Sequence, residues 1–229
     1  MDRNEKIRKA YRMTGNNSFY DGMITCSSLL GKAVSRLVWG MGSKDAAEYQ
    51  ARALSGIPED FSGCLLEVPV GTGVLTMSVY QTLPDADITC LDYSLDMMAK
   101  AQKRAERLGL QNVAFKQGDV GKLPFKDESF DIVLSLNGFH AFPNKRAAYQ
   151  ETFRALKSGG VFCGCFYVTG LCRRTDWFIR RIYQPLKFFT PPYETIDSLY
   201  IRLRSMYCQV ELSHVNSIAC FVCRKENSC

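Results

Sequence analysis

The sequence lacks long apolar runs, since no window of its 229 residues approaches eighteen uninterrupted apolar positions. We therefore expect no segment that spans a bilayer. It also lacks internal repeats and low-complexity segments. The charged start Met1 to Lys6 offers no apolar signal segment. Histidine is scarce, because His140 and His214 are the two copies, and this leaves few candidates for a histidine base.

Cysteine, in contrast, is present ten times, scattered along the chain and often inside apolar runs. That usage fits a reducing, cytoplasmic compartment. Cys220 and Cys223 have the spacing of half a zinc site, but no second Cys or His pair stands at the right distance. In a strand the two side chains would face opposite sides. No metal site is expected.

Charge is distributed unevenly along the chain. Residues 1–44 carry 8 Lys/Arg against 3 Asp/Glu, and residues 171–207 carry 7 against 3. The middle, residues 45–170, carries 12 against 15 and is mildly acidic. The length and the 46% hydrophobic content predict one domain over residues 1–229, with basic segments flanking its centre.

Helical and strand-like patterns alternate from residue 43 onward. Expected helices are residues 44–54 with Ser43 as the cap, about 74–82 before Pro84, 95–108 capped by Ser94, and 145–156 capped by Asn144. Expected strands are 64–68, 88–92, 113–116, 130–136 and 161–168, followed by a hairpin of 209–215 and 218–224. This order predicts an α/β fold with a doubly wound, mostly parallel sheet.

A glycine loop follows the first expected strand, with Gly71 and Gly73 where a helix should begin. Such a loop lets backbone N–H groups approach a ligand closely. Nineteen residues past Gly73, Asp92 ends the second strand, where its carboxylate would accept hydrogen bonds from a ribose and repel a 2′-phosphate. The alternative is a structural turn and a solvated aspartate.

An ordered set of motifs covers about residues 60–170. Glu67-Val-Pro-Val-Gly-Thr-Gly73 resembles the acid-x-Gly-x-Gly-x-Gly loop of class I S-adenosylmethionine (SAM) methyltransferases. Asp92-Tyr93-Ser94, Gln117-Gly118-Asp119-Val120, and the stretches 130–140 and 156–160 are similar to later motifs of that family. Pro69, in place of the first glycine, and Ser158, in place of a proline, depart from its pattern.

The resemblance implies a seven-stranded Rossmann-like methyltransferase fold with an antiparallel C-terminal strand, and SAM as cofactor. Glu67 would hold the ammonium group of SAM, and Pro69, Gly71 and Gly73 would form the loop beside it. Asp92 would bind the ribose, while Tyr93 and Met97 would flank the adenine. Gly118, Asp119 and Val120 would read the adenine edge. The Asn137 carbonyl would meet the ammonium group. Core packing of Met97, an Asx turn at Asp119 and a backbone-bonded Glu67 are the structural alternatives.

Pro69 bears on the choice of cofactor, because proline has no N–H to offer a pyrophosphate. Thr76 also stands where a dinucleotide fingerprint needs its third glycine. Both residues argue against an NAD-dependent oxidoreductase. A looser turn, and thus weaker SAM binding, is the expected consequence of Pro69.

His140 is the candidate catalytic base, with structural packing as its alternative. Methyl transfer is an in-line displacement that needs alignment more than a base. Residues 1–43 and 171–207 are expected to form helical lid segments, rich in aromatic residues such as Phe19, Tyr20 and Trp39, and Trp177, Phe189 and Tyr193. They would cover a small, acidic or aromatic methyl acceptor, although helices simply packed on the sheet would show the same pattern.

Other readings stay open. Phe19-Tyr20-Asp21 resembles the Tyr-Asp entry of quinone-biosynthesis methyltransferases. Thr190-Pro-Pro-Tyr193 resembles a nucleic-acid methyltransferase motif, but it lies more than fifty residues past its expected place after the fourth strand, so a nucleic acid is not the expected partner. A SAM-binding regulatory module without turnover would have the same fold. The sequence leaves the oligomeric state open.

Overall fold

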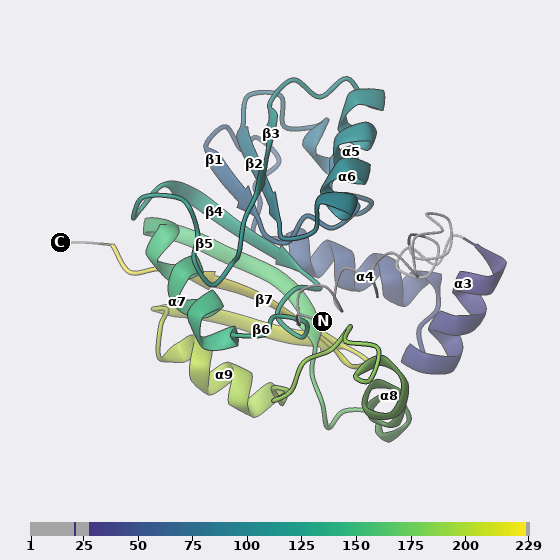
Figure 1. The fold of residues 1–229 in the computed structure, drawn as a ribbon. Helices are drawn as coiled ribbons and strands as arrows, with labels where there is room; N and C mark the ends of the chain where they lie inside the picture. The colour runs from purple at the N-terminus through teal and green to yellow at the C-terminus, as the bar shows by residue number, and fades with distance from the viewer. Residues whose placement is uncertain (1–20, 22–27, 228–229) are drawn as a thin grey trace, which may run out of the picture.

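Helices cover both faces of a seven-stranded sheet in the computed structural model, which describes residue 21 and residues 28–227 (Figure 1). The strands are β1 (Cys64–Glu67), β2 (Asp87–Asp92), β3 (Val113–Gln117), β4 (Phe130–Leu136), β5 (Leu156–Tyr167), β6 (Gln209–Val215) and β7 (Ile218–Arg224). Their order across the sheet is β3-β2-β1-β4-β5-β7-β6. Strands β1 to β5 pair in parallel, and β7 pairs antiparallel with β5 and β6. The predicted fold class is confirmed.

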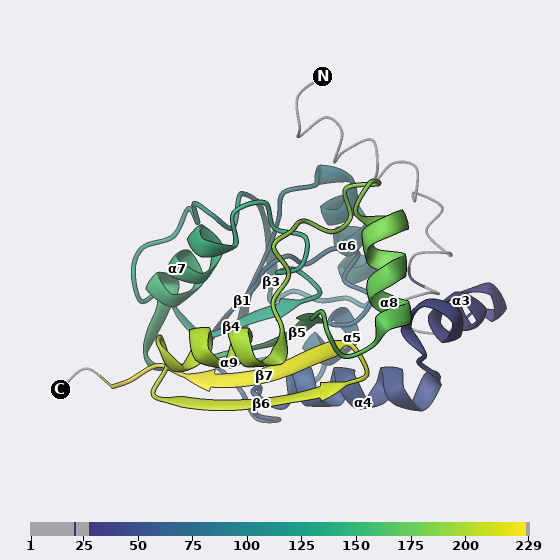
Figure 2. The same cartoon turned by 90° about the horizontal axis from the view of Figure 1, so that it is seen from below.

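The described helices are α3 (Leu29–Val34), the π-helix η1 (Ser35–Trp39), α4 (Ser43–Leu54), α5 (Met77–Tyr80), α6 (Leu95–Arg107), α7 (Lys145–Ala155), α8 (Arg173–Phe178), the π-helix η2 (Ile179–Tyr183) and α9 (Ile196–Arg204). Helices α5 and α6 lie on one side of the sheet, and α7 and α9 on the other (Figures 1 and 2). None of them is long and apolar enough to cross a bilayer.

Alternation of side chains along each strand divides the core into two layers. Leu65 faces one hydrophobic cluster with α4, α5 and α6, while its neighbour Leu66 faces a second cluster with α7 and α9. Cys220 and Cys223 of β7 likewise belong to different clusters. Because both strand faces are buried, the central strands read as continuous apolar runs rather than alternating ones.

The expected elements match the structure closely, with three differences. Ser43 lies inside α4, because Gly42 is the cap and its N–H donates to the carboxylate of Asp45 (2.7 Å). The helix expected over 74–82 is shortened to α5, with turns on either side. Strand β5 starts at Leu156, so the expected turn at Gly159-Gly160 is part of a longer strand.

The structure describes the two expected lid segments to different extents. Phe19 and Tyr20 lie outside the described residues. Within 171–207, α8 contacts η1, where the Thr175 hydroxyl donates to the Val38 carbonyl (2.8 Å), and η2 follows α8 directly. Helix α9 instead packs against β6, and its Leu199 and Leu203 are buried in the core. The segment beside the N-terminal helices is therefore α8 with η2, and α9 covers the sheet.

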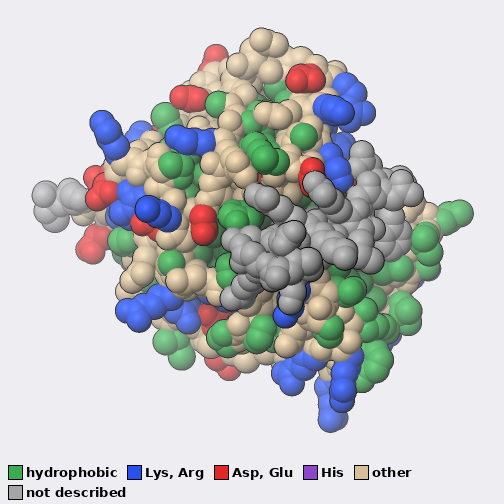
Figure 3. Space-filling view, viewed as in Figure 1, with side chains coloured by type: hydrophobic (Ala, Val, Ile, Leu, Met, Phe, Trp, Pro, Cys, Tyr) green, Lys and Arg blue, Asp and Glu red, His purple; other side chains and the backbone are tan. Residues whose placement is uncertain are grey.

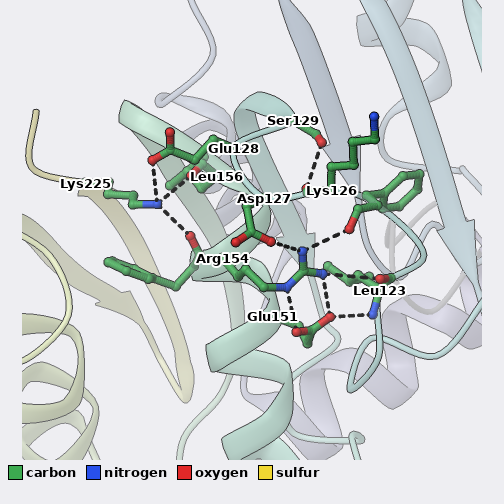
Figure 4. A network of polar contacts seen from close by, with 11 residues as sticks. Leu123, Lys126, Asp127, Glu128, Ser129, Glu151, Arg154, Leu156 and Lys225 are labelled. Atoms are coloured by element: carbon green, nitrogen blue, oxygen red, sulfur yellow. Dashed lines mark hydrogen bonds and ion pairs between the residues drawn. The ribbon is translucent and has the colours of Figure 1, made fainter. Parts of the chain in front are cut away.

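Arg154 of α7 anchors the loop between β3 and β4 (Figure 4). Its guanidinium donates to the carbonyls of Leu123 (3.3 Å) and Phe125 (2.9 Å) and pairs with Glu151 and Asp127. Glu151 in turn accepts the Leu123 N–H (2.7 Å). This network fixes the loop that begins at the Gly118-Asp119-Val120 stretch.

We expect Arg154→Ala to lower the free energy of unfolding by about 2 kcal/mol, because the charged hydrogen bonds to the Leu123 and Phe125 carbonyls are lost. Arg154→Lys should recover only part of this, since an ammonium group lacks the planar fork. Urea unfolding of the three proteins measures the difference. Equal stability of Arg154→Ala and the parent would contradict the anchoring role.

Candidate cofactor-binding site

A pocket opens at the carboxyl ends of β1, β2 and β4, beside the point where the chain crosses from one half of the sheet to the other. Ligands of open α/β sheets bind at such switch points. Among the residues that line it are all those predicted to bind the cofactor: Glu67, Pro69, Gly71, Gly73, Asp92, Tyr93, Met97, Gly118, Asp119, Val120 and Asn137. The structure thus brings these positions together, and their individual roles stay predictions.

Gly71 and Gly73 shape the loop between β1 and α5. Both have positive φ angles, 57° and 67°, which other residues adopt only with strain. A Cβ on Gly71 would meet no atom within 4 Å, so this backbone borders open space. A Cβ on Gly73 would instead approach Met77 and Ala101. Gly71 therefore leaves room at the pocket, while Gly73 permits helix packing behind it.

Pro69 fits without the loss of a sheet hydrogen bond. The Val68 N–H donates to the Leu134 carbonyl (2.9 Å) and the Val70 N–H to the Leu91 carbonyl (3.0 Å), so the loop is tied to β4 on one side and β2 on the other. Pro69, which has no N–H, lies between these two bonds. Its ring packs on Gly138, where a Cβ would clash with it. Pro69 is thus part of the pocket wall.

Asp92 is buried at the end of β2, with 6% of its surface exposed. Its Oδ2 accepts the Gly71 N–H and its Oδ1 accepts the Ser94 N–H, each at 2.8 Å. Burial raises the pKa of Asp92 to about 6, although these hydrogen bonds oppose the shift. Each carboxylate oxygen keeps a second lone pair, which suits a vicinal diol.

Glu67 lies deeper in a polar network that the sequence did not reveal. Its Oε2 accepts hydrogen bonds from the Thr76 hydroxyl (3.0 Å) and the Tyr80 hydroxyl (2.8 Å), and the Cys90 thiol lies at 3.6 Å. Burial raises the pKa of Glu67 to about 8, so the carboxyl is mostly protonated at neutral pH. Thr76, which stands where a dinucleotide fingerprint would have its third glycine, thus donates a hydrogen bond to Glu67.

The third acidic residue of the pocket is Asp119. Its Oδ1 accepts the Gly121 N–H (2.8 Å), so the Asx turn named as its alternative is present. The other oxygen has no such bond to Gly121. Gly118 packs closely on Leu91, where a Cβ would come within 2.9 Å of a methyl carbon. This close packing places Asp119 and Val120 at the pocket.

Asn137 lines the pocket just past the end of β4, before a mostly apolar stretch of lining residues. It has a left-handed backbone with φ of 54°, and its N–H donates to the Cys165 carbonyl (2.7 Å). Beyond it, Ala141, Phe142 and Pro143 line the pocket. This apolar end borders the expected reaction centre.

His140 does not belong to the pocket lining, in contrast to its neighbour Ala141. Its ring stacks on Phe189 with centroids 4.2 Å apart, and its Nδ1 accepts the Tyr167 N–H (3.3 Å). Burial lowers the pKa of His140 to about 3, so the ring is neutral. A neutral ring that accepts at Nδ1 carries its proton on Nε2. This geometry favours the packing alternative, and the role as a base stays a prediction.

The expected lid aromatics form one packed cluster around Phe189. Trp39 lies 6.1 Å from the Phe189 ring and 6.0 Å from Tyr167, and Tyr183 lies 5.8 Å from Phe189. Phe166, an aromatic residue of β5, belongs instead to the core cluster on the opposite side of the sheet. Trp177 is exposed. The aromatic residues therefore contact one another and His140.

Two further residues hold the glycine loop. The Thr72 hydroxyl donates to Asp21 (2.6 Å), whose other oxygen pairs with Arg104 of α6 (2.6 Å). The Arg104 Nε also donates to the Thr72 carbonyl (3.3 Å). Asp21 belongs to the Phe19-Tyr20-Asp21 stretch noted in the sequence, but Arg104 carried no signal because the pairing spans more than eighty positions.

The charge of the pocket is one-sided. Glu67, Asp92 and Asp119 line it, whereas no Lys or Arg of the described residues does. Such a site favours a ligand with positive charge and disfavours a pyrophosphate. The site and the fold together define a pocket at the switch point of a Rossmann-like sheet, whose charge suits a ligand that carries a cationic group and no phosphate.

Comparison with known proteins assigns the family. Residues 64–187, more than half of the chain, match the family model described as methyltransferase domain. The chain belongs to this family.

Curated relatives match over part of their length. Residues of this chain are 35% identical over 112 positions to demethylmenaquinone methyltransferase of Thermus thermophilus, covering 49% of this chain and 50% of that protein. They are 38% identical over 98 positions to the phthiotriol/phenolphthiotriol dimycocerosates methyltransferase of Mycobacterium tuberculosis, and this match covers 43% of this chain and 35% of that protein. The chain thus spans about half, or less, of the length of the curated relatives it matches.

Solved structures share the fold. The [4+2]-cyclase SpnF aligns with a TM-score of 0.67 at 18% identity over 81% of this chain and 83% of that one. A SAM-dependent methyltransferase from Thermotoga maritima aligns with a TM-score of 0.67 at 15% identity, and the alignment covers 96% of this chain and 100% of that one. At such identity the likeness shows the fold alone.

The burial of Glu67 predicts a pH-dependent stability difference. In the unfolded chain Glu67 ionises near its ordinary pKa of 4.5, whereas in the folded protein it stays protonated up to about pH 8. Its contribution to stability is therefore complete below pH 4.5 and is lost as the pH rises to about 8. Glu67→Gln, which does not ionise, should gain stability relative to the parent over this range. Urea unfolding at several pH values measures the gap, and a constant gap would contradict the buried acid.

Proposed function

We propose that this protein is a SAM-dependent methyltransferase that acts on a small hydrophobic molecule. The observation that carries the proposal is the pocket at the switch point of a methyltransferase-family fold, lined by three acidic residues, of which Glu67 is protonated, and no described Lys or Arg. SAM is an adenosine with a sulfonium and an ammonium group and no phosphate. The acidic residues of the pocket suit a ligand with this charge.

Each part of the pocket matches one part of the cofactor. Asp92, held by the Gly71 and Ser94 N–H groups, offers lone pairs to the ribose hydroxyls. Asp119, Val120, Tyr93 and Met97 line the pocket, and we assign them to the adenine. Glu67 and the Asn137 carbonyl remain for the ammonium group. The open space beside Gly71 is a cradle that a Cβ would fill.

Bound SAM supplies an activated methyl group. The chain's own contribution is to hold the two reactants in line and to exclude water. The apolar end formed by Ala141, Phe142 and Pro143 is where an acceptor would lie. A cation near Glu67 would favour its ionised form, so we expect cofactor binding to release a proton at neutral pH.

The acceptor class rests on the relatives and on the apolar lining. The relatives are named for a menaquinone precursor and for phthiotriol lipids. We infer a hydrophobic acceptor, such as a quinol or a lipid alcohol. A reducing, cytoplasmic setting fits the free cysteines at positions 64, 90, 163, 165, 172, 208, 220 and 223.

The direct test is ligand-induced stabilisation followed by turnover. SAM and adenosylhomocysteine should raise the thermal midpoint, and NAD should not. Methyl transfer from labelled SAM should then be measured against quinols, lipid alcohols and RNA. Stabilisation by NAD alone would overturn the proposal. Binding of SAM without turnover on any acceptor would favour the regulatory module.

Asp92→Asn should weaken adenosylhomocysteine binding by roughly 30-fold or more, because the charge is lost and an NH2 donor replaces one of the two acceptor oxygens. Asp85→Asn, an identical change at an exposed position, is the matched control and should leave the Kd unchanged. Calorimetric titration gives both constants, and circular dichroism checks that each variant is folded. Equal affinity of Asp92→Asn and the parent would remove Asp92 from the binding site.

His140→Gln separates the two roles of this histidine. The amide oxygen can still accept the Tyr167 N–H, but it is no base. We expect less than a tenfold loss in kcat and an unchanged pH profile, since removing a general base costs about 100-fold or more. Steady-state rates between pH 5.5 and 8 give the answer. A loss of that size, with a vanished pH inflection, would establish the base.

A further inference from the structure

A basic and apolar face covers the outer side of α3, η1, α8 and η2. Helices α3 and α8 lie side by side in both ribbon views (Figures 1 and 2). Arg174 donates to the Arg36 carbonyl (3.3 Å), and Thr175 binds the Val38 carbonyl, so the two segments form one continuous surface. We call this surface the α3–α8 face.

Large apolar side chains of this face point outward. On α3 and η1, Leu29 is 87% exposed, and Leu30 and Leu37 are also exposed. On α8 and η2, Trp177 is 55% and Ile182 41% exposed. Figure 3 shows hydrophobic side chains gathered over α3 and α8, with Lys and Arg side chains along the edge below α8. Contiguous apolar side chains on a surface indicate an interaction site.

The same face is strongly positive. Lys32 and Arg36 flank the exposed leucines of α3 and η1. Around Trp177, helical spacing places Arg173, Arg174, Arg180 and Arg181 on the same exposed side. Residues 28–40 contain no acid.

In 171–189 the single acid, Asp176, is turned inward. Its carboxylate accepts the Tyr167 hydroxyl (2.6 Å) and the Gly170 N–H (2.9 Å). The arginines of the face therefore have no acidic neighbour within their own two segments.

We propose that the α3–α8 face binds the surface of an anionic lipid bilayer. A surface that mixes leucines, one tryptophan and arginines lies in the boundary between headgroups and acyl chains. The tryptophan ring and the aliphatic side chains enter that boundary, and the cations contact lipid phosphates. The proposal goes beyond methyl transfer and does not depend on it.

Two other occupants fit the face less well. A second copy on a two-fold axis would place this positive face against itself, which costs Coulomb energy. A nucleic acid would satisfy the arginines through its phosphates but offers no apolar layer for the exposed leucines. A bilayer satisfies both kinds of side chain.

The face is linked to one edge of the pocket through residues that follow η2. Beneath it, Trp39 and Phe189 contact each other, and Phe189 stacks on His140. The Thr190 N–H donates to the His140 carbonyl (2.9 Å), next to Ala141 of the pocket lining. Docking on a bilayer would therefore present the acceptor end of the pocket to lipid-dissolved molecules.

Vesicle sedimentation of the full chain tests the proposal without cofactor or acceptor. We expect binding to vesicles of phosphatidylcholine with phosphatidylglycerol, weak binding to phosphatidylcholine alone, and weakening by salt. Each basic residue near an anionic surface strengthens binding about fivefold, so Arg180→Ser with Arg181→Ser should weaken it about 25-fold. Lys103→Ser with Lys126→Ser, the same charge change at exposed sites outside the face, should have little effect.

A second readout reports on the face itself. Of the two tryptophans, Trp39→Phe leaves Trp177 as the only one. Its emission should shift to the blue on addition of the anionic vesicles. No shift and no sedimentation would overturn the proposal.

Three further outcomes would also overturn it. Equal loss of binding in both charge variants would show that binding does not depend on this face. Tighter binding to RNA than to vesicles would favour a nucleic acid, and a dimer in sedimentation velocity that the Arg180→Ser and Arg181→Ser double variant dissociates would favour a second copy. Because SAM stabilisation is measured separately, failure here leaves the methyltransferase assignment untouched.

Discussion

The hydrogen bonds that Asp92 accepts from Gly71 and Ser94 join three parts of the molecule at one point. Gly71 belongs to the loop after β1, Asp92 ends β2, and Ser94 caps α6. A buried carboxylate needs such donors, because removal from water raises its pKa and disfavours the charge. The glycine loop supplies one donor only if its backbone adopts a positive φ. Loop conformation, strand end and helix start are therefore specified together, and the pocket wall follows from them.

The pocket keeps acidic groups close together at a cost in stability. Glu67 and Asp92 both have raised pKa values because burial disfavours their ionised forms. Hydrogen bonds from Thr76 and Tyr80 reduce this cost at Glu67 without removing it. A bound cation would stabilise the ionised carboxylates more in this enclosed site than in water. Burial of these acids thus lowers the stability of the fold and also strengthens its preference for a positively charged ligand.

The sequence predicted the sheet well, and the residues it singled out for the cofactor line one pocket, since local signals mark both the strands and the loops that follow them. Turn and cap residues such as Ser94 and Asn144 act on neighbours within three positions, and the strands are marked by apolar runs. Long-range pairings had no such signal. The contact of Pro69 with Gly138 and the bonds among Asp21, Thr72 and Arg104 depend on how the chain folds back. The sequence also did not show that His140 lies outside the pocket lining. The spacing of strands predicts that a residue lies near the edge of the sheet, but it does not predict the direction of its side chain.

Fold alone does not decide the reaction, because a [4+2]-cyclase shares this architecture. The distinction lies in how the acceptor end of the pocket is built. Phe189, Trp39 and Tyr167 pack against one another, and Phe189 stacks on His140, whose neighbour Ala141 lines the pocket. These ring contacts join η1 to the residues around Phe189, and α8 contacts η1 in turn. The outer side of these packed segments is the basic and apolar surface. The proposed hydrophobic acceptor and the proposed contact with a bilayer would therefore depend on the same packing.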